Sequence, residues 1–195
     1  MCGIFGYTGT GRAPEIVLEG LKRLEYRGYD SFGIAVPGTP VQVIKKQGRI
    51  SDAGQCTYSL HGTVAIGHTR WATHGVPSDV NAHPHQDCTG KIAVVHNGII
   101  ENYAELKREL LGRGHRFRSE TDTEVIAHLL EEAYNGDLMR AVDSILPRLE
   151  GSYALLCIAD NDPRIIAARQ HSPLVLGIGD GSMIAASDMT PVLEH

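Results

Sequence analysis

The sequence lacks the features that point to a membrane or to a nucleic acid. Its longest apolar runs fall far short of the roughly 20 residues that cross a bilayer, and no basic stretch leads into an apolar one at the N-terminus. Lys and Arg form no block, and the formal net charge is −5. We therefore expect a cytoplasmic protein with no nucleic-acid and no membrane partner.

Cysteine and low-complexity sequence are also scarce. The chain has four widely separated cysteines and no Cys-x-x-Cys pair, which argues against a disulfide framework. No repeat or long linker divides the 195 residues, and 42% of them are hydrophobic. A chain of this length and composition can bury one full core, so we expect a single domain over residues 1–195.

Histidine is common, with ten residues in the chain. The best candidates for metal ligands are His83 and His85, together with His68 and His74 earlier in the chain. Because no cysteine or carboxylate stands at ligand spacing beside them, polar residues that hold loop backbone are the better interpretation. We therefore expect no bound metal and no other cofactor.

Hydrophobic periodicity predicts that strands surround a central block of helices. Short apolar segments between Gly, Pro and Asp turns predict strands at 3–7, 31–36, 41–46, 63–68, 92–96, 153–159, 165–168, 174–179 and 183–186. Helical stripes predict helices at 14–24, 103–111, 123–134 and 138–149. This order favours a layered α+β sandwich over a doubly wound parallel sheet.

Cys2 is the first residue along the chain that suggests catalytic chemistry. Removal of Met1 would leave Cys2 with a thiol and a free α-amine, which are a nucleophile and a base on one residue. The reference pKa of that amine is about 7.7–8.0, so much of it can accept a proton near neutral pH. An inert, buried strand cysteine is the plainer interpretation of the first six residues alone.

A polar segment, residues 68–75, follows the apolar run 64–67 and is expected to leave a strand end for a loop. Arg70 can bind a carboxylate through two parallel hydrogen bonds, and Thr73 with nearby backbone N–H groups can complete an anion site. A surface salt bridge is the simpler role for an arginine. Trp71, the only tryptophan in the chain, stands beside it and favours a ligand site.

Asn97 and Gly98 lie between apolar residues, which is a strong signal for a hairpin turn. A tight turn there would also fix two donors, the Asn97 amide and the Gly98 N–H, for a developing oxyanion. Each donor of this kind is worth about 2.7–4 kcal/mol of transition-state stabilisation. The structural and the catalytic interpretation are compatible.

Residues 121–124 (Thr-Asp-Thr-Glu) match a capping box, with Thr121 as N-cap and Glu124 reaching back. Asp122 lies within this segment. The plainer interpretation is an acid that stabilises a helix N-terminus, and the functional interpretation is a carboxylate that binds a substrate ammonium. Arg70 can bind a carboxylate, and Asp122 can bind an ammonium. Together with a thiol and an oxyanion site, these groups predict acyl transfer on glutamine.

With these motifs the sequence resembles the glutaminase domains of glucosamine-6-phosphate synthases (glutamine–fructose-6-phosphate aminotransferases), a branch of the class II glutamine amidotransferases. The likeness covers nearly the whole chain and rests on the segments MCGI, LEYRGYDS, HTRWATHG, NAHPH, HNGIIEN and SETDTE. It implies the N-terminal-nucleophile hydrolase fold, a four-layer αββα sandwich of two antiparallel sheets between helical layers. It also implies that Cys2 is the nucleophile and that Asn97 and Gly98 form the oxyanion site.

The resemblance also implies how L-glutamine is held. Arg70, with Thr73 and His74 beside it, would bind the substrate carboxylate, and Asp122 would bind the ammonium. Trp71 would lie on a loop that closes over the substrate. In the family, the ammonia passes to a sugar-phosphate isomerase domain, which we expect to be absent from residues 1–195.

Several expectations concern the chain as a whole. We expect the active form to begin at Cys2, the glutaminase domain to be shortened at its C-terminus, and the full-length protein to be a homo-oligomer. The glutaminase domains of amidophosphoribosyltransferase, asparagine synthetase and glutamate synthase are alternatives within the same class. A non-catalytic amino-acid-binding module is the alternative from a different class.

Overall fold

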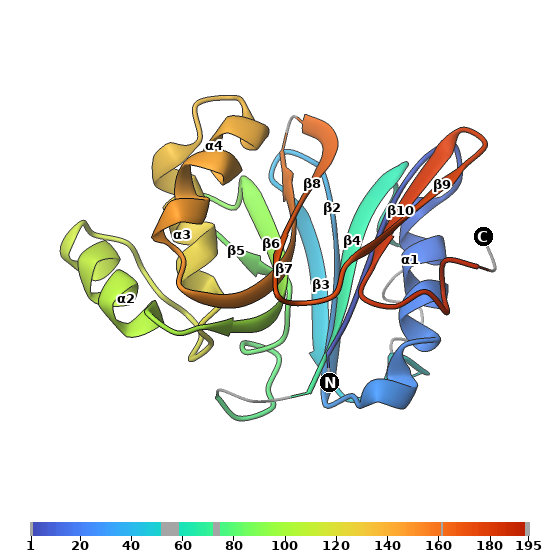
Figure 1. Cartoon of the computed structure of the whole chain (residues 1–195), viewed down its shortest axis with the longest axis horizontal. Helices are drawn as coiled ribbons and strands as arrows, with labels where there is room; N and C mark the ends of the chain where they lie inside the picture. The colour runs from blue at the N-terminus through green and yellow to red at the C-terminus, as the bar shows by residue number, and fades with distance from the viewer. Residues whose placement is uncertain (1, 52–58, 72–74, 161, 194–195) are drawn as a thin grey trace.

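The chain folds into two antiparallel sheets packed face to face, with helices on both outer faces (Figure 1). The computed structural model describes residues 2–51, 59–71, 75–160 and 162–193. One sheet has six strands in the order β3-β2-β4-β1-β10-β9, and the other has four in the order β5-β6-β7-β8. Every pairing between named strands is antiparallel.

The elements follow the expected order along the chain. The strands are β1 (Gly3–Thr8), β2 (Ser31–Val36), β3 (Gln42–Gln47), β4 (Val64–Arg70), β5 (His85–Gln86), β6 (Ile92–Ile100), β7 (Gly151–Ala159), β8 (Asp162–Gln170), β9 (Val175–Gly179) and β10 (Ser182–Ala186). The helices are α1 (Ala13–Lys22), α2 (Tyr103–Gly112), α3 (Glu124–Ala133) and α4 (Leu138–Ile145), with short 3-10 turns η1 (Glu25–Arg27) and η3 (Leu146–Arg148).

Three apolar cores lie between the four layers. Each strand can contribute to two of them, because its successive side chains point to opposite faces of the sheet. In β1, Ile4 faces the second sheet and Phe5 faces α1, while in β6 Val95 faces the first sheet and Val94 faces the helices. All four side chains are fully buried. Burying a side chain of this size stabilises the fold by about 1.5–3 kcal/mol, so the alternation fixes which face of each strand points inward.

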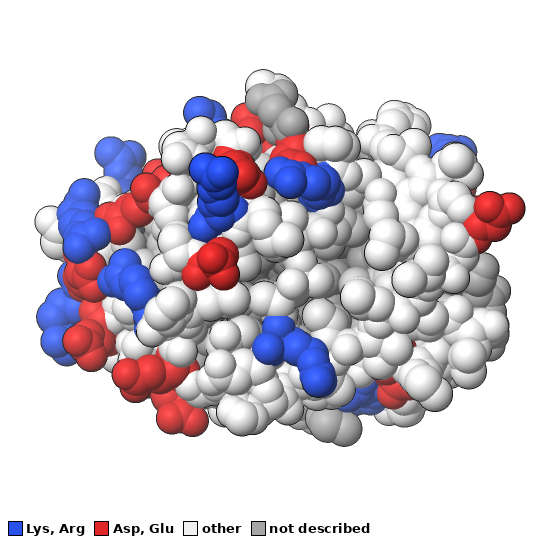
Figure 2. Space-filling model, turned by 45° about the horizontal axis from the view of Figure 1, so that its top comes forward, with Lys and Arg blue, Asp and Glu red and all other residues white. Residues whose placement is uncertain are grey.

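Helices cover the two outer faces unequally. Helix α1 packs on β1, β2 and β4, and α3 and α4 pack on the second sheet, with α2 against α3. The α+β four-layer sandwich predicted from the sequence is confirmed. None of the helices in the described ranges is long and apolar enough to cross a membrane. Figure 2 shows basic and acidic side chains interspersed over the side built by α2 to α4, with the other side of that face mostly uncharged.

The predicted hairpin turn at Asn97 and Gly98 is wrong. Both residues lie inside β6, which runs on to Ile100 and stays paired with β7, with Gly98 opposite Tyr153. Gly98 has a φ of 127°, a backbone conformation that favours glycine. A Cβ built there would lie 2.0 Å from the carbonyl oxygen of Ser152. The Asn-Gly pair therefore marks a close approach between two strands.

The predicted capping box is also wrong in register. The N-cap of α3 is Thr123, and its side chain makes no capping bond. Thr121 Oγ1 lies 3.0 Å from Nε2 of His85, and the Glu124 carboxylate accepts backbone N–H bonds from Arg118 (2.8 Å) and Ser119 (2.6 Å). The segment before α3 is therefore fastened to its neighbours through side chains, which positions Asp122 just ahead of the helix.

Gly98→Ala should destabilise the fold, because the added Cβ meets the Ser152 carbonyl and the backbone conformation is strained for any other residue. We expect urea unfolding to show a loss of about 1–3 kcal/mol or more. Gly112→Ala is the matched control, since a Cβ at this position in α2 meets nothing within 4 Å and should be neutral or stabilising. Equal unfolding midpoints for the two variants would contradict this explanation.

Candidate active site

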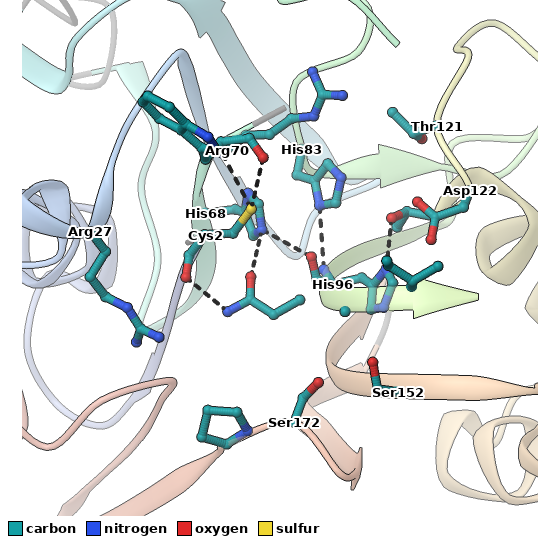
Figure 3. A pocket seen from close by; sticks show the side chains of 16 residues that line it. Cys2, Arg27, His68, Arg70, His83, His96, Thr121, Asp122, Ser152 and Ser172 are labelled. Atoms are coloured by element: carbon teal, nitrogen blue, oxygen red, sulfur yellow. Dashed lines mark hydrogen bonds between the residues drawn. The ribbon is translucent and has the colours of Figure 1, made fainter. Parts of the chain in front are cut away.

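A pocket of about 400 Å³ opens between the two sheets and the segment before α3. Its volume lies within the range of small-molecule sites. Six of the residues to which the sequence assigns a role in glutamine hydrolysis line it: Cys2, Arg70, Trp71, Asn97, Gly98 and Asp122. Figure 3 shows Cys2 and His68 on one side of the pocket and His96 and Asp122 on the other.

Cys2 owes its position to the pairing of β1 with β4. Gly3 pairs with Thr69, so Cys2 stands beside the end of β4 and the start of the following loop. The Trp71 backbone N–H donates to Cys2 Sγ at 3.2 Å, and the thiol donates to the Trp71 carbonyl at 3.4 Å. Burial raises the pKa of the Cys2 thiol, and the Trp71 N–H bond offsets only part of that rise. The thiol therefore needs a base to become nucleophilic near neutral pH.

His68 fixes the orientation of the Asn97 side chain. Its Nε2 lies 3.0 Å from Asn97 Oδ1 and 3.0 Å from the His96 carbonyl oxygen. Both of these are acceptors, so Nε2 must carry the ring proton. The Asn97 amide nitrogen is thereby turned toward Cys2 and donates to its carbonyl oxygen at 3.1 Å. Burial lowers the pKa of His68 to about 3, so this ring stays neutral at physiological pH.

Further histidines support this arrangement. The His83 ring stacks on His68 with centroids 4.1 Å apart, and His85 meets His83 edge-on at 4.7 Å. His96 Nδ1 lies 2.9 Å from Thr123 Oγ1, which joins β6 to the start of α3. Burial lowers the pKa of His83, His85 and His96. The rings His68, His83 and His85, considered from the sequence as metal ligands, form a neutral cluster, of which His68 and His83 line the pocket.

Two buried, oppositely charged side chains lie on the pocket wall. Arg70 ends β4, is 4% exposed, and donates from Nη2 to the Gly75 carbonyl at 3.1 Å. Asp122 is 6% exposed, and its Oδ2 accepts the Ile100 N–H at 2.8 Å. A guanidinium and a carboxylate on one cavity suit a ligand that carries both charges, such as an α-amino acid.

The loop that follows Arg70 is only partly described. Trp71 is 54% exposed, and its ring lies over Gly28, where a Cβ would come within 2.6 Å of the indole. Thr73 and His74, which the sequence assigns to the carboxylate site, lie outside the described residues. Their roles, like those of the other assigned residues, stay predictions.

Sequence reasoning missed several residues of the pocket. Arg27 from η1 lines it, and its side chain donates to the Ser187 carbonyl at 3.1 Å. Ser172 and Pro173 reach the pocket from the connection between β8 and β9. The preceding His171 has a φ of 63°, uncommon for a residue other than glycine. No motif in the sequence signals that conformation, which only the folded backbone reveals.

The comparisons with known proteins agree on one group. The family described as "Glutamine amidotransferase domain" matches residues 68–194. The chain is 57% identical to a glutamine–fructose-6-phosphate aminotransferase (isomerizing) of Pyrococcus horikoshii and 54% identical to one of Thermus thermophilus. Both alignments cover 100% of this chain and 34% and 33% of those relatives, so the chain spans about a third of their length.

Solved structures with the same fold include a glutamine phosphoribosylpyrophosphate amidotransferase from B. subtilis, described in complex with ADP and GMP. It is 30% identical and matches with a TM-score of 0.85 over 99% of this chain and 44% of its own. An allosteric regulatory enzyme of purine biosynthesis matches equally well, at 31% identity and a TM-score of 0.85 over 97% of this chain and 42% of that one.

The neutral state of His68 should appear in the pH dependence of stability. Its pKa is lowered in the folded protein, so the unfolded chain takes up a proton first as the pH falls, and stability is lost below the unfolded pKa. Between pH 7 and pH 5 this single group should cost about 2 kcal/mol of unfolding free energy. Urea unfolding of wild type and His68→Gln at both pH values isolates the effect. An equal drop in the two proteins would contradict a buried, neutral His68.

Proposed function

The chain belongs to the glutamine amidotransferase domain family, and on this basis we propose that it hydrolyses L-glutamine to glutamate and ammonia through a thioester on Cys2. The observation that carries the proposal is the convergence of Cys2, Asn97, Arg70 and Asp122 on one pocket. These groups come from the start of β1, from β6, from the end of β4 and from the segment before α3. They supply a nucleophile, an oxyanion donor and two charges for an α-amino acid.

Substrate orientation follows from the charges. Arg70 would bind the α-carboxylate, with Thr73 and His74 beside it, and Asp122 would bind the α-ammonium. With both α-substituents held, the α-carbon is fixed and the side-chain carboxamide at the other end of the substrate points toward Cys2. Trp71 would lie over the bound substrate from the loop after β4. Fixing the α-carbon end of the substrate in this way converts attack on the carboxamide into an effectively intramolecular step.

The chemistry begins with the thiol. Because burial raises the pKa of Cys2, its proton must pass to a base, and the α-amine of Cys2 is that base once Met1 is removed. The sulfur attacks the δ-carbonyl carbon and forms a tetrahedral oxyanion, which accepts hydrogen bonds from the Asn97 amide and the Gly98 N–H. The C–N bond then breaks, and the protonated α-amine gives its proton to the departing ammonia. Water hydrolyses the thioester and releases glutamate.

We also propose which larger enzyme contains this domain. We place this domain (residues 1–195) as the ammonia-supplying part of an enzyme that makes glucosamine 6-phosphate from fructose 6-phosphate. Support comes from the identity of 54–57% with proteins of that name, against 30% with the phosphoribosylpyrophosphate amidotransferase. The ammonia would pass to a sugar-phosphate isomerase domain of a homo-oligomeric protein. The cytoplasm is the compartment we propose, and the free state of Cys2, Cys88 and Cys157 is in keeping with it.

Cys2→Ala tests the nucleophile and separates catalysis from simple amino-acid binding. We expect ammonia release from glutamine to fall to background, because no other group replaces the sulfur, while glutamine still binds. Ammonia release is measured with a coupled glutamate dehydrogenase assay, and binding is measured by calorimetry. Intact mass should show that the active wild-type sample begins at Cys2. Equal rates in both proteins, activity in neither, or full activity of a chain that keeps Met1 would each refute the assignment.

Asp122→Asn tests how the ammonium is recognised. Wild type should prefer glutamine to glutaramate, which lacks the α-amine, by about 1.5–3 kcal/mol in kcat/KM, the worth of a charged hydrogen bond. In Asp122→Asn that preference should largely disappear, because the amide keeps the shape but loses the charge. Glu101→Gln, which removes an exposed charge outside the pocket lining, is the matched control and should keep the preference. An unchanged preference in Asp122→Asn would place the ammonium elsewhere.

A further inference from the structure

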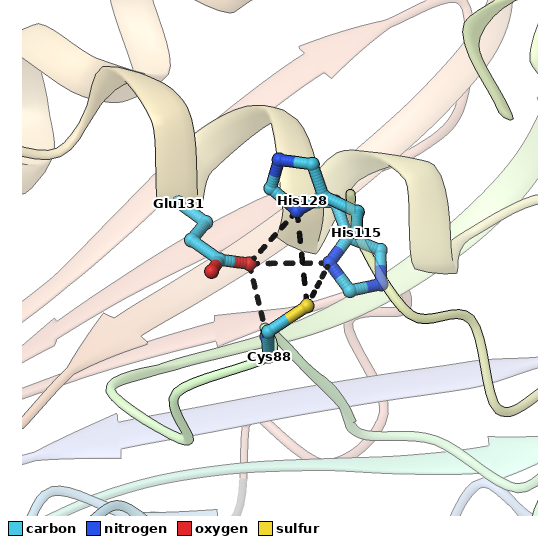
Figure 4. A group of neighbouring side chains, drawn as sticks. All are labelled: Cys88, His115, His128 and Glu131. Atoms are coloured by element: carbon cyan, nitrogen blue, oxygen red, sulfur yellow. Dashed lines mark hydrogen bonds and ion pairs between the residues drawn. The ribbon is translucent and has the colours of Figure 1, made fainter. Parts of the chain in front are cut away.

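A second cluster of chemically active side chains lies on the helical side of the molecule, apart from the proposed glutaminase residues. Cys88 comes from the turn between β5 and β6, His115 from the loop after α2, and His128 and Glu131 from α3 (Figure 4). Each offers one ligand atom, and these four atoms all lie within 4.8 Å of one another. Residues 128 and 131 are three apart on a helix and so share one face.

Four of the six separations among these ligand atoms are close to those of a tetrahedral zinc site. Cys88 Sγ lies 3.8 Å from His115 Nδ1 and 3.6 Å from His128 Nδ1. Glu131 Oε2 lies 3.1 Å from His115 Nδ1 and 3.3 Å from His128 Nδ1. Bonds of about 2.3 Å to sulfur and about 2.0–2.1 Å to nitrogen or oxygen at tetrahedral angles put S···N near about 3.6 Å and N···O near about 3.3 Å. The four measured distances lie within a few tenths of an ångström of these values.

Hydrogen bonds account for only part of this geometry: the Cys88 backbone N–H donates to Glu131 Oε2 at 2.9 Å, but the contacts around the two imidazole rings are not all satisfied. Each imidazole Nδ1 faces both the Glu131 carboxylate, which only accepts, and the Cys88 sulfur. A ring nitrogen has either one proton or one lone pair, so it cannot serve both neighbours well. A cation at the centre of the four atoms would be bound by all of them at once.

A carboxylate lies near the outer ring nitrogen of each imidazole, although His128 Nε2 makes no hydrogen bond to any described residue. His115 Nε2 lies 3.4 Å from Glu132 Oε1, and His128 Nε2 lies 3.6 Å from Glu124 Oε1. A carboxylate behind each ring favours the tautomer with its proton on Nε2 and a lone pair on Nδ1 facing the centre. The Arg116 backbone N–H donates to Cys88 Sγ at 3.3 Å, which stabilises negative charge on sulfur.

The charge balance also suits a divalent cation. A Cys88 thiolate and the Glu131 carboxylate together carry the two negative charges that neutralise Zn²⁺. Arg113, Arg116 and Arg118 also line this cavity, and of these Arg113 is paired with Glu109 and Glu132 at 2.6 and 2.7 Å, which largely compensates its charge. Burial raises the pKa of the Cys88 thiol, so metal binding has to displace a proton from the sulfur.

We propose that Cys88, His115, His128 and Glu131 bind a zinc ion in a closed, structural site. Four protein ligands complete the tetrahedron, which is typical of structural and not of catalytic zinc. The ion would fasten the β5–β6 turn and the loop after α2 to helix α3. Helix α3 begins next to Thr123, which bonds His96 on the pocket wall, so the metal would hold that wall in place. The zinc proposal does not rest on the glutaminase activity proposed above.

Cobalt substitution tests the site directly in the untagged, metal-stripped chain. We expect one equivalent of Co²⁺ to give the intense visible bands of a tetrahedral centre and a thiolate-to-cobalt charge-transfer band, both abolished by Zn²⁺. Cys88→Ser should lose the charge-transfer band and weaken binding at least about tenfold. Cys2→Ser is the matched control, because it removes a thiol from the other pocket, and it should keep the full spectrum.

A measurement on wild type keeps the test independent of whether variants fold. X-ray absorption of the zinc-loaded chain should show one sulfur and three nitrogen or oxygen neighbours around the metal. Zinc should also raise the thermal midpoint of wild type by clearly more than that of folded Cys88→Ser. The proposal is overturned by a zinc shell without sulfur, by a charge-transfer band that survives Cys88→Ser, or by failure to retain one equivalent of zinc.

Discussion

The antiparallel pairing of β1 with β4 is the contact on which the rest of the site depends. It places residue 2 beside the end of β4, where Arg70 closes the strand and Trp71 begins the loop. Ile4 and Ile66, both fully buried, hold the two strands against the second sheet. If β1 slipped by one residue, its apolar side chains would exchange faces and the core between the sheets would be lost. The position of the sulfur is therefore fixed by burial of side chains far from the pocket.

Uncharged groups from both sheets complete the pocket. Neutral His68 holds the Asn97 amide, and neutral His96 joins β6 to Thr123 ahead of α3. Keeping these rings unprotonated leaves Arg70 and Asp122 as oppositely charged groups on the pocket wall. Because electrostatic interactions strengthen where water is excluded, two buried charges on one cavity select a zwitterionic ligand more sharply than exposed ones would.

Much of this structure could be predicted from the sequence, because local patterns and global packing agree. The short apolar runs of β1 and β2 and the stripes of α2 and α3 predict bounds within one or two residues of those observed. The structural predictions that are wrong concern segments in which tertiary contacts override the preference of the local sequence. Asn97 and Gly98 have the composition of a turn, yet pairing with β7 keeps them in a strand, and the oxyanion role needs no turn.

Other features have no local signal at all. Thr121 was expected to cap a helix, but its hydroxyl bonds His85 from a distant strand. Ser172 enters the pocket through a backbone conformation at His171 that no residue pattern announces. The proposed zinc ligands at positions 88, 115, 128 and 131 come from three segments with no metal-binding spacing, so only the fold brings them together.

The central claim is that the sulfur of Cys2 forms a covalent bond with the substrate. Rapid acid quench during turnover with glutamine, followed by peptide mapping in a mass spectrometer, tests it most directly. A glutamyl adduct on the Cys2 sulfur, formed only in chains that begin at Cys2, is the predicted result. Ammonia release without any adduct on Cys2, or an adduct on another residue, would contradict it.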